Sequence, residues 1–167
     1  YAHDPLDEIA QKKPDLLINL SASPCHIRKE EQRLELLGRV AQKCNCPVVY
    51  VNAVGGNDEL VFDGSSLSVN QDGSLHNFCD SFSEKIAVHD FADQCSTNYP
   101  NISPMESLRQ ALVLGVRDYA HKSGFKKGLI GLSGGIDSAL TAAIAVEALG
   151  SENVIGISLP SSISSQH

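Results

Sequence analysis

The stretch that decides the fold of this chain is LIGLSGGIDSALT, residues 129–141. Its apolar beginning has the character of a buried strand, and its alanine-rich end has the periodicity of a helix. Between them, Gly134 and Gly135 permit backbone conformations that larger residues avoid, and they let a ligand approach the main chain closely. The segment therefore predicts a strand, a tight glycine turn and a helix, in that order.

The predicted turn has the properties of an anion-binding site. The helix that follows directs its unpaired N–H groups and positive dipole end toward the glycines, and Ser133 and Ser138 add hydroxyl groups. These groups suit an anion such as pyrophosphate. Asp137 would repel a bare phosphate, but its carboxylate fits if Mg²⁺ lies between it and the phosphate oxygens. In the alternative interpretation, Asp137 merely caps the helix.

Two other phosphate-binding motifs do not fit the turn. A Walker A loop requires a lysine directly after its glycines, and none follows here. The dinucleotide fingerprint requires G-x-G-x-x-G, and Gly131, Gly134 and Gly135 have a different spacing. The turn therefore belongs to neither class.

The residues around the turn predict a βαβ unit. Upstream, MESLRQALVLGVRDYAHKSG predicts a helix with one apolar face, made of Leu108, Ala111, Leu112, Val116 and Tyr119. A strand (KKGLIGL), a helix (DSALTAAIAVEALG) and a second strand (NVIGISLP) follow. Strands that alternate with helices in this way predict a parallel sheet.

The first half of the chain also alternates helix and strand. DPLDEIAQKKP and KEEQRLELLGRVAQKC predict helices, DLLINLSAS predicts a buried strand, and CPVVYVNAV predicts a strand rich in β-branched residues. Further on, Asp63-Gly64 and Asp72-Gly73 are hairpin-turn signals between short strand-like runs. We expect an α/β sandwich or layered sheet that ends in antiparallel strands.

Composition limits the class of protein. The chain has 167 residues, of which 42% are apolar, so it can form a hydrophobic core. Its net charge is −7 without any basic block, which argues against nucleic acid as the main partner. No apolar run reaches the length of a membrane span. The five scattered cysteines are typical of free thiols in a reducing compartment, so we expect the cytoplasm.

The chain is predicted to hold two partial domains. Residues 90–104 contain two prolines and no sustained period, which indicates a linker between them. The chain begins with Tyr1, so we expect it to be incomplete at its start. Cys44 and Cys46 lack a second pair or a histidine at zinc-site spacing, so we expect no metal site there.

Both halves resemble known families. LSGGIDSAL resembles the S-G-G-x-D-S loop of the ATP pyrophosphatase superfamily, whose members cleave ATP between its α and β phosphates and adenylate an acid or related group. LLINLSASP and PVVYVNAVGGNDELVFDGSS resemble the C-terminal half of carbon–nitrogen hydrolase (nitrilase-type) domains. One chain that joins both is characteristic of the glutamine-dependent NAD⁺ synthetase family.

The resemblance implies a fold and domain boundaries. Residues 1–90 would form the C-terminal part of an α-β-β-α nitrilase-type sandwich, and residues 91–104 a linker. Residues 105–167 would begin a parallel-sheet, adenine nucleotide alpha hydrolase-like (Rossmann-like) domain. In the family, full-length chains assemble into homo-oligomers.

The resemblance also implies ligands for the second half. The loop residues would hold the ATP β and γ phosphates, with Asp137 as a Mg²⁺ ligand; they are Ser133, Gly134, Gly135, Ile136, Asp137 and Ser138. Ser158, Leu159 and Pro160 would line the adenosine pocket. Family members often carry an aromatic and a basic residue just after this segment, where this chain has Ser162 and Ile163.

For the first half, the resemblance implies a glutaminase whose Glu–Lys–Cys triad lies upstream of this chain, so no catalytic residue is expected here. Ser23 matches a family position beside bound glutamine; alternatively, it only helps to end a strand. Cys25 lies where the family usually has an aromatic residue, so we interpret it as a packing residue. Glu59 is one acid in a loop, with no nucleophile nearby to activate.

The function expected from the resemblance is amide ligation. ATP and Mg²⁺ would serve to adenylate nicotinic acid adenine dinucleotide, and glutamine-derived ammonia would then displace AMP to give NAD⁺. The 167-residue chain alone is expected to be inactive. The alternatives are another glutamine-dependent amidotransferase of the ATP pyrophosphatase type and a non-catalytic nucleotide-binding module.

Overall fold

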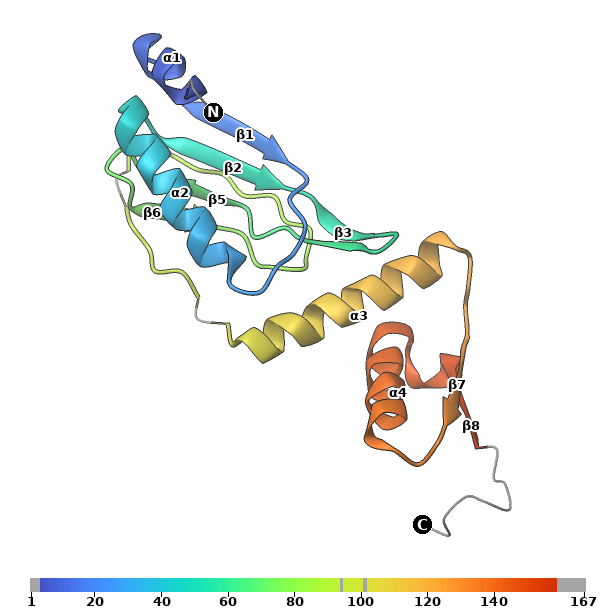
Figure 1. The fold of residues 1–167 in the computed structure, drawn as a ribbon. Helices are drawn as coiled ribbons and strands as arrows, with labels where there is room; N and C mark the ends of the chain where they lie inside the picture. The colour runs from blue at the N-terminus through green and yellow to red at the C-terminus, as the bar shows by residue number, and fades with distance from the viewer. Residues whose placement is uncertain (1–3, 94, 101, 159–167) are drawn as a thin grey trace. The chain divides into compact units, whose positions relative to one another are not determined.

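The computed structural model describes residues 4–93, 95–100 and 102–158 (Figure 1). The chain divides into two compact units. The first comprises residues up to 55 together with 62–107, and the second comprises 56–61 with the residues from 108 onward. Both units combine helices and strands, so the predicted α/β class is confirmed.

The first unit is built on a four-stranded sheet with the strand order β1-β2-β5-β6. Strands β1 and β2 are parallel, whereas β5 is antiparallel to both β2 and β6. Helix α2 covers one face of this sheet, and α1 packs against α2 (Figure 1). These elements are α1 (Pro5–Gln11), β1 (Leu17–Ser21), α2 (Lys29–Cys44), β2 (Val48–Asn52), β5 (Leu67–Val69) and β6 (Leu75–Phe78).

The core of this unit lies between α2 and the sheet. Leu37 and Ala41 are four residues apart, so they share one face of α2, and both are buried. Val48 and Tyr50 point to the same side of β2 because side chains alternate along a strand. These residues pack with Leu67, Val69 and Leu75 in one hydrophobic cluster. The amphipathic pattern of α2 and the β-branched run of β2 are thereby both explained.

Strand β1 forms where it was predicted, but the prediction that it is buried is wrong on one face. Leu17 packs against the hydrophobic cluster. The side chains of Ile18 and Leu20, which share the opposite face, are 63% and 77% exposed. The reason is that α2 covers only one face of the sheet within the residues that the structure describes.

Of the two predicted hairpin turns, one is confirmed and one is wrong. Asp72-Gly73 connects β5 and β6, and Gly73 has the positive φ of 86° that favours glycine. Asp63-Gly64 does not form a hairpin, since β4 (Leu60–Asp63) pairs with β3 (Val54–Asn57) and not with β5. The β3–β4 turn falls instead at Asp58, whose φ is 51°.

The second unit contains the predicted βαβ segment. Strands β7 (Gly128–Leu132) and β8 (Val154–Ser158) are parallel, as predicted, and α4 (Ile136–Leu149) connects them through the short 3₁₀ helix η1 (Ser151–Asn153). Helix α3 (Pro104–Lys122) precedes β7. Within this unit the Gly56 N–H donates to the Asp118 carboxylate at 2.8 Å, and the Gly56 carbonyl accepts a hydrogen bond from Lys122.

Other parts of the chain carry less regular structure. Between β6 and α3, the described residues form no helix and only one isolated bridge, from Ser81 to Gly64. The boundaries of the linker and of both domains remain predictions.

Among the described residues, no helix is long and apolar enough to cross a membrane.

Candidate functional site

The glycine turn connects β7 to α4 with three residues, Ser133, Gly134 and Gly135. Gly134 has a φ of 83°, a conformation that residues with a Cβ atom adopt only at a cost. A Cβ atom added there would meet no other atom within 4 Å. Glycine is therefore favoured here because it adopts this backbone conformation readily, and the space in front of it is open to a ligand.

Two serines hold this turn together. The Ser133 N–H donates to Ser138 Oγ at 3.3 Å, and the Ser138 hydroxyl donates to the Gly135 carbonyl at 2.9 Å. The hydroxyl oxygens of Ser133 and Ser138 lie 3.2 Å apart. Ser133 and Gly135 are exposed, whereas Ser138 is half-buried.

The N-terminal end of α4 opens into the same turn. Gly135 is the N-cap residue, and no side chain makes a capping hydrogen bond there. The first N–H groups of a helix have no partner within the helix, so the groups at the start of α4 remain available to an anion. Asp137 lies inside the first turn of α4 and is not the cap. The simple capping interpretation of Asp137 is therefore wrong.

Asp137 places one carboxylate at the start of α4. Its main-chain carbonyl accepts the Thr141 hydroxyl at 2.8 Å, and its side chain is exposed. In the described residues, no group of three or more histidine, cysteine or carboxylate side chains is arranged to hold a metal. A single carboxylate nevertheless fits Mg²⁺, which keeps several waters and takes its other ligands from substrate phosphates.

Ser158 lies at the same edge of the sheet as the glycine turn. It is the last residue of β8, and it is paired with Leu132, the last residue of β7. Ligands of open parallel sheets bind beyond the carboxyl ends of the strands, which is where both residues lie. Leu159 and Pro160, which were predicted to line the same pocket, fall outside the described residues.

A second group of polar residues lies in the first unit, around Ser23. The Ser23 N–H donates to Asn52 Oδ1 at 2.7 Å, and Asn52 Nδ2 donates to the Ser23 carbonyl at 3.1 Å. Asn52 Nδ2 also donates to Asp63 Oδ1 at 3.2 Å. Asn52 and Asp63 are buried, whereas Ser23 is half-buried. The segment after β1 is thus fixed from the end of β2.

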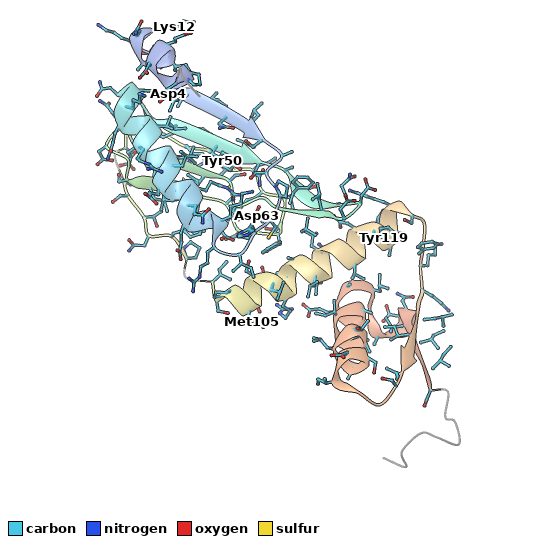
Figure 2. All side chains as sticks on the ribbon, in the orientation of Figure 1. Asp4, Lys12, Tyr50, Asp63, Met105 and Tyr119 are labelled. Atoms are coloured by element: carbon cyan, nitrogen blue, oxygen red, sulfur yellow. The ribbon has the colours of Figure 1, made fainter. Side chains whose placement is uncertain are left out.

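Asp63 is held in turn by two further side chains. Arg33 donates from Nη1 to Asp63 Oδ2 at 3.0 Å and from Nη2 to Oδ1 at 3.2 Å. The Ser65 hydroxyl donates to Asp63 Oδ2 at 2.8 Å. The Arg33 guanidinium lies 5.1 Å from the ring centre of Tyr50, and Figure 2 shows Tyr50 and Asp63 beside α2. Every polar side chain of this buried network therefore has partners.

Comparison with known proteins shows what this chain is similar to. Residues 108–167 match the NAD synthase family. The whole chain is 49% identical to a glutamine-dependent NAD⁺ synthetase from Synechocystis, of which it covers 31%. A solved glutamine-dependent NAD⁺ synthetase from Acinetobacter baumannii, in complex with ADP, matches 96% of this chain with 37% identity and a TM-score of 0.90. The chain therefore matches about a third of a glutamine-dependent NAD⁺ synthetase.

A second structure gives the same relationship. The enzyme from Cytophaga hutchinsonii, also a glutamine-dependent NAD⁺ synthetase, matches 83% of this chain with 28% identity and a TM-score of 0.73. The chain spans 31% of the length of its Synechocystis relative and 32% of the Acinetobacter baumannii chain. The similarity to glutamine-dependent NAD⁺ synthetases therefore covers about a third of the relatives' length.

Two other predicted residues of this chain can be assessed from their surroundings. Burial, reinforced by the negative charges of Asp63 and Glu30, raises the pKa of Cys25 to about 11. At neutral pH the group is a thiol, which favours its interpretation as a packing residue, because the thiolate is the nucleophilic form. Glu59 is exposed in the β3–β4 turn, which gives no support to a role as general base.

Sequence reasoning missed the network of Arg33, Asn52 and Asp63. One signal was present, since Arg33 lies four residues before Leu37 on the apolar face of α2. A charged residue on such a face requires a buried partner. The identity of that partner was not readable from the sequence, because Asp63 lies 30 residues away.

Proposed function

We propose that this chain is part of an enzyme that uses ATP to adenylate nicotinic acid adenine dinucleotide and then amidates it with ammonia from glutamine. The products are NAD⁺, AMP and pyrophosphate. The observation that carries the proposal is the open glycine turn at Gly134, on a chain 49% identical to a glutamine-dependent NAD⁺ synthetase. The relative from Acinetobacter baumannii, solved with ADP, supports a nucleotide as the ligand.

In the first step, a carboxylate oxygen of the dinucleotide attacks the α-phosphorus of ATP, and the bond between the α-phosphorus and the bridging oxygen breaks. Negative charge then accumulates on the departing pyrophosphate. The N–H groups at the start of α4 and the Ser133 and Ser138 hydroxyls would bind this charge, helped by Ile136 and both glycines of the turn. Mg²⁺, held by Asp137 and phosphate oxygens, would supply positive charge there.

In the second step, ammonia attacks the activated carbonyl carbon, and AMP leaves with its bonding electron pair. Ser158 would contact the adenosine from the end of β8, together with Leu159 and Pro160. Ser23 would contact the glutamine that supplies the ammonia. Its hydroxyl has no hydrogen-bond partner in the described part of the chain, and it lies on a segment held firmly by Asn52.

The wider architecture follows the same proposal. Residues 1–90 would form part of a nitrilase-type glutaminase domain, and residues 91–104 a linker. Residues 105–167 would form part of an adenine nucleotide alpha hydrolase-like domain. The five cysteines, all free thiols in the structure, suit the cytoplasm, and the enzyme would act as a homo-oligomer.

The test is synthesis of NAD⁺ by the protein expressed from its complete gene. The reaction contains the acid dinucleotide, ATP and Mg²⁺, with either glutamine or an ammonium salt as nitrogen donor. The proposal predicts NAD⁺ from both donors. Formation of another amidated product, or ATP binding without any turnover, would contradict it.

A further inference from the structure

We infer that Asn52 is a positioning residue for glutamine hydrolysis, because its side-chain amide fixes the main chain of Ser23. This inference rests on the proposed function, in which Ser23 contacts glutamine. Asn52 itself would touch neither the substrate nor the reacting atoms. Its role would be to hold the segment after β1 where the Ser23 hydroxyl can meet its ligand.

One amide group satisfies both backbone groups of Ser23. The Ser23 N–H donates to Asn52 Oδ1 at 2.7 Å, and Asn52 Nδ2 donates to the Ser23 carbonyl at 3.1 Å. Two hydrogen bonds to one residue fix its orientation as well as its position. These two hydrogen bonds do not involve the Ser23 side chain. Its hydroxyl can therefore bind a ligand without breaking either of them.

The amide is itself held in a single orientation. Asn52 Nδ2 also donates to Asp63 Oδ1 at 3.2 Å, and Asp63 is fixed by Arg33. If the amide were reversed, its oxygen would face the Asp63 carboxylate and its NH₂ group would face the Ser23 N–H. Both contacts would be repulsive, so the network permits only one assignment of the amide.

The main chain of Asn52 is anchored as well. Asn52 is the last residue of β2, paired with Ser21 of β1, and its own N–H donates to Ser66 Oγ at 3.0 Å. The side chain is buried, with 6% of the residue exposed. The Asn52 amide therefore connects Ser23 to the end of β2, and loss of the amide would let the Ser23 segment shift. Small displacements of a substrate-binding group are costly for an enzyme.

The test compares two nitrogen donors in the protein expressed from its complete gene. We expect N52A to raise the KM for glutamine by about tenfold, since buried hydrogen bonds are lost. The rate with saturating ammonium should stay within about twofold of the wild type, because ammonia bypasses glutamine hydrolysis. N70A is the matched control. Asn70 is half-buried and, like Asn52, hydrogen-bonded through its side chain, to Ser74 and Cys95, but it lies at the other end of the sheet.

A second variant, N52D, distinguishes loss of positioning from a folding defect in N52A. N52D keeps an acceptor for the Ser23 N–H but loses the donor to the Ser23 carbonyl and to Asp63. We expect the ratio of its KM for glutamine to that of the wild type to decrease as the pH is lowered from about 8 to about 6. Protonation of a carboxyl group beside Asp63 restores one O–H donor there. This recovery is a signature that loss of general stability would not produce.

Several outcomes would overturn the inference. One is a glutamine KM within about twofold of the wild type in both variants. Another is an equal loss of the glutamine-dependent and ammonium-dependent rates in both variants, because it would make Asn52 a structural residue only. A wild-type protein that is inactive with both donors would overturn the proposed function, and this inference with it.

Discussion

Arg33 and Asp63 form a buried, bidentate ion pair that joins α2 to the end of β4. The guanidinium donates to both carboxylate oxygens, at 3.0 and 3.2 Å, and the two residues are 6% and 1% exposed. Burial disfavours a charged guanidinium, but the hydrogen bonds and negative charge of Asp63 outweigh it and raise the pKa of Arg33. The pair anchors Asn52 and, through it, Ser23.

Breaking this pair should strongly destabilise the first unit. Asp63→Asn leaves the Arg33 charge buried without a counter-charge, so we expect the free energy of unfolding to fall by about 3–5 kcal/mol. Urea unfolding followed by circular dichroism measures the change. Glu35→Gln is the control, because Glu35 pairs with Arg39 at 3.9 Å on the exposed face of α2. Its effect should stay below about 1 kcal/mol, and similar losses in the two variants would contradict the role of burial.

Gly134→Ala should weaken ATP binding. The added methyl group disfavours the φ of 83° and occupies the open space in front of the turn. We expect the Kd for ATP to rise by about tenfold or more, which corresponds to the cost of a left-handed residue. Isothermal titration calorimetry gives the Kd. Gly131→Ala is the matched control, since a Cβ atom there also meets nothing within 4 Å. An equal effect at both glycines would argue against a special role for Gly134.

Asp137→Asn should remove the dependence of ATP binding on Mg²⁺. The amide keeps the size of the side chain but lacks the charge that Mg²⁺ favours. Wild-type protein should bind ATP more tightly with Mg²⁺ than with EDTA, whereas the variant should bind ATP similarly under both conditions. If the variant keeps the full Mg²⁺ effect, the cation does not contact Asp137.

Cys25 should react slowly with iodoacetamide at neutral pH. Burial and nearby negative charges raise its pKa to about 11, so its thiolate fraction is very small at neutral pH. Peptide mass spectrometry after timed alkylation should show a rate that rises about tenfold per pH unit from pH 7 to pH 10. A rate that levels off below pH 9 would indicate a reactive thiolate and reopen the question of a catalytic cysteine.

Features encoded locally could be predicted from the sequence. The bounds of α2, Lys29–Cys44, coincide with the predicted segment because its apolar residues recur on one face. The strand, glycine turn and helix around Gly134 were also predicted, since glycine spacing and periodicity lie within a few residues. The position of the candidate site at this turn could be predicted for the same reason.

Features that depend on distant residues could not be predicted. Asp63-Gly64 has a hairpin composition, yet Asp63 is used by Arg33, Asn52 and Ser65, and the chain passes from one sheet to another there. The exposure of Leu20 could not be derived from an apolar run, because it depends on which face of the sheet α2 covers. The hydrogen-bond partners of Ser23 could not be predicted either, because they come from segments tens of residues away.

Transfer of an isotopic label tests the central claim most directly. The acid dinucleotide is prepared with a heavy oxygen isotope in its carboxylate, and the protein from the complete gene converts it with ATP, Mg²⁺ and ammonium. Adenylation of the carboxylate predicts that one labelled oxygen appears in AMP, which mass spectrometry detects, and that pyrophosphate is released with it. Unlabelled AMP, or the release of ADP and phosphate in its place, would contradict the account.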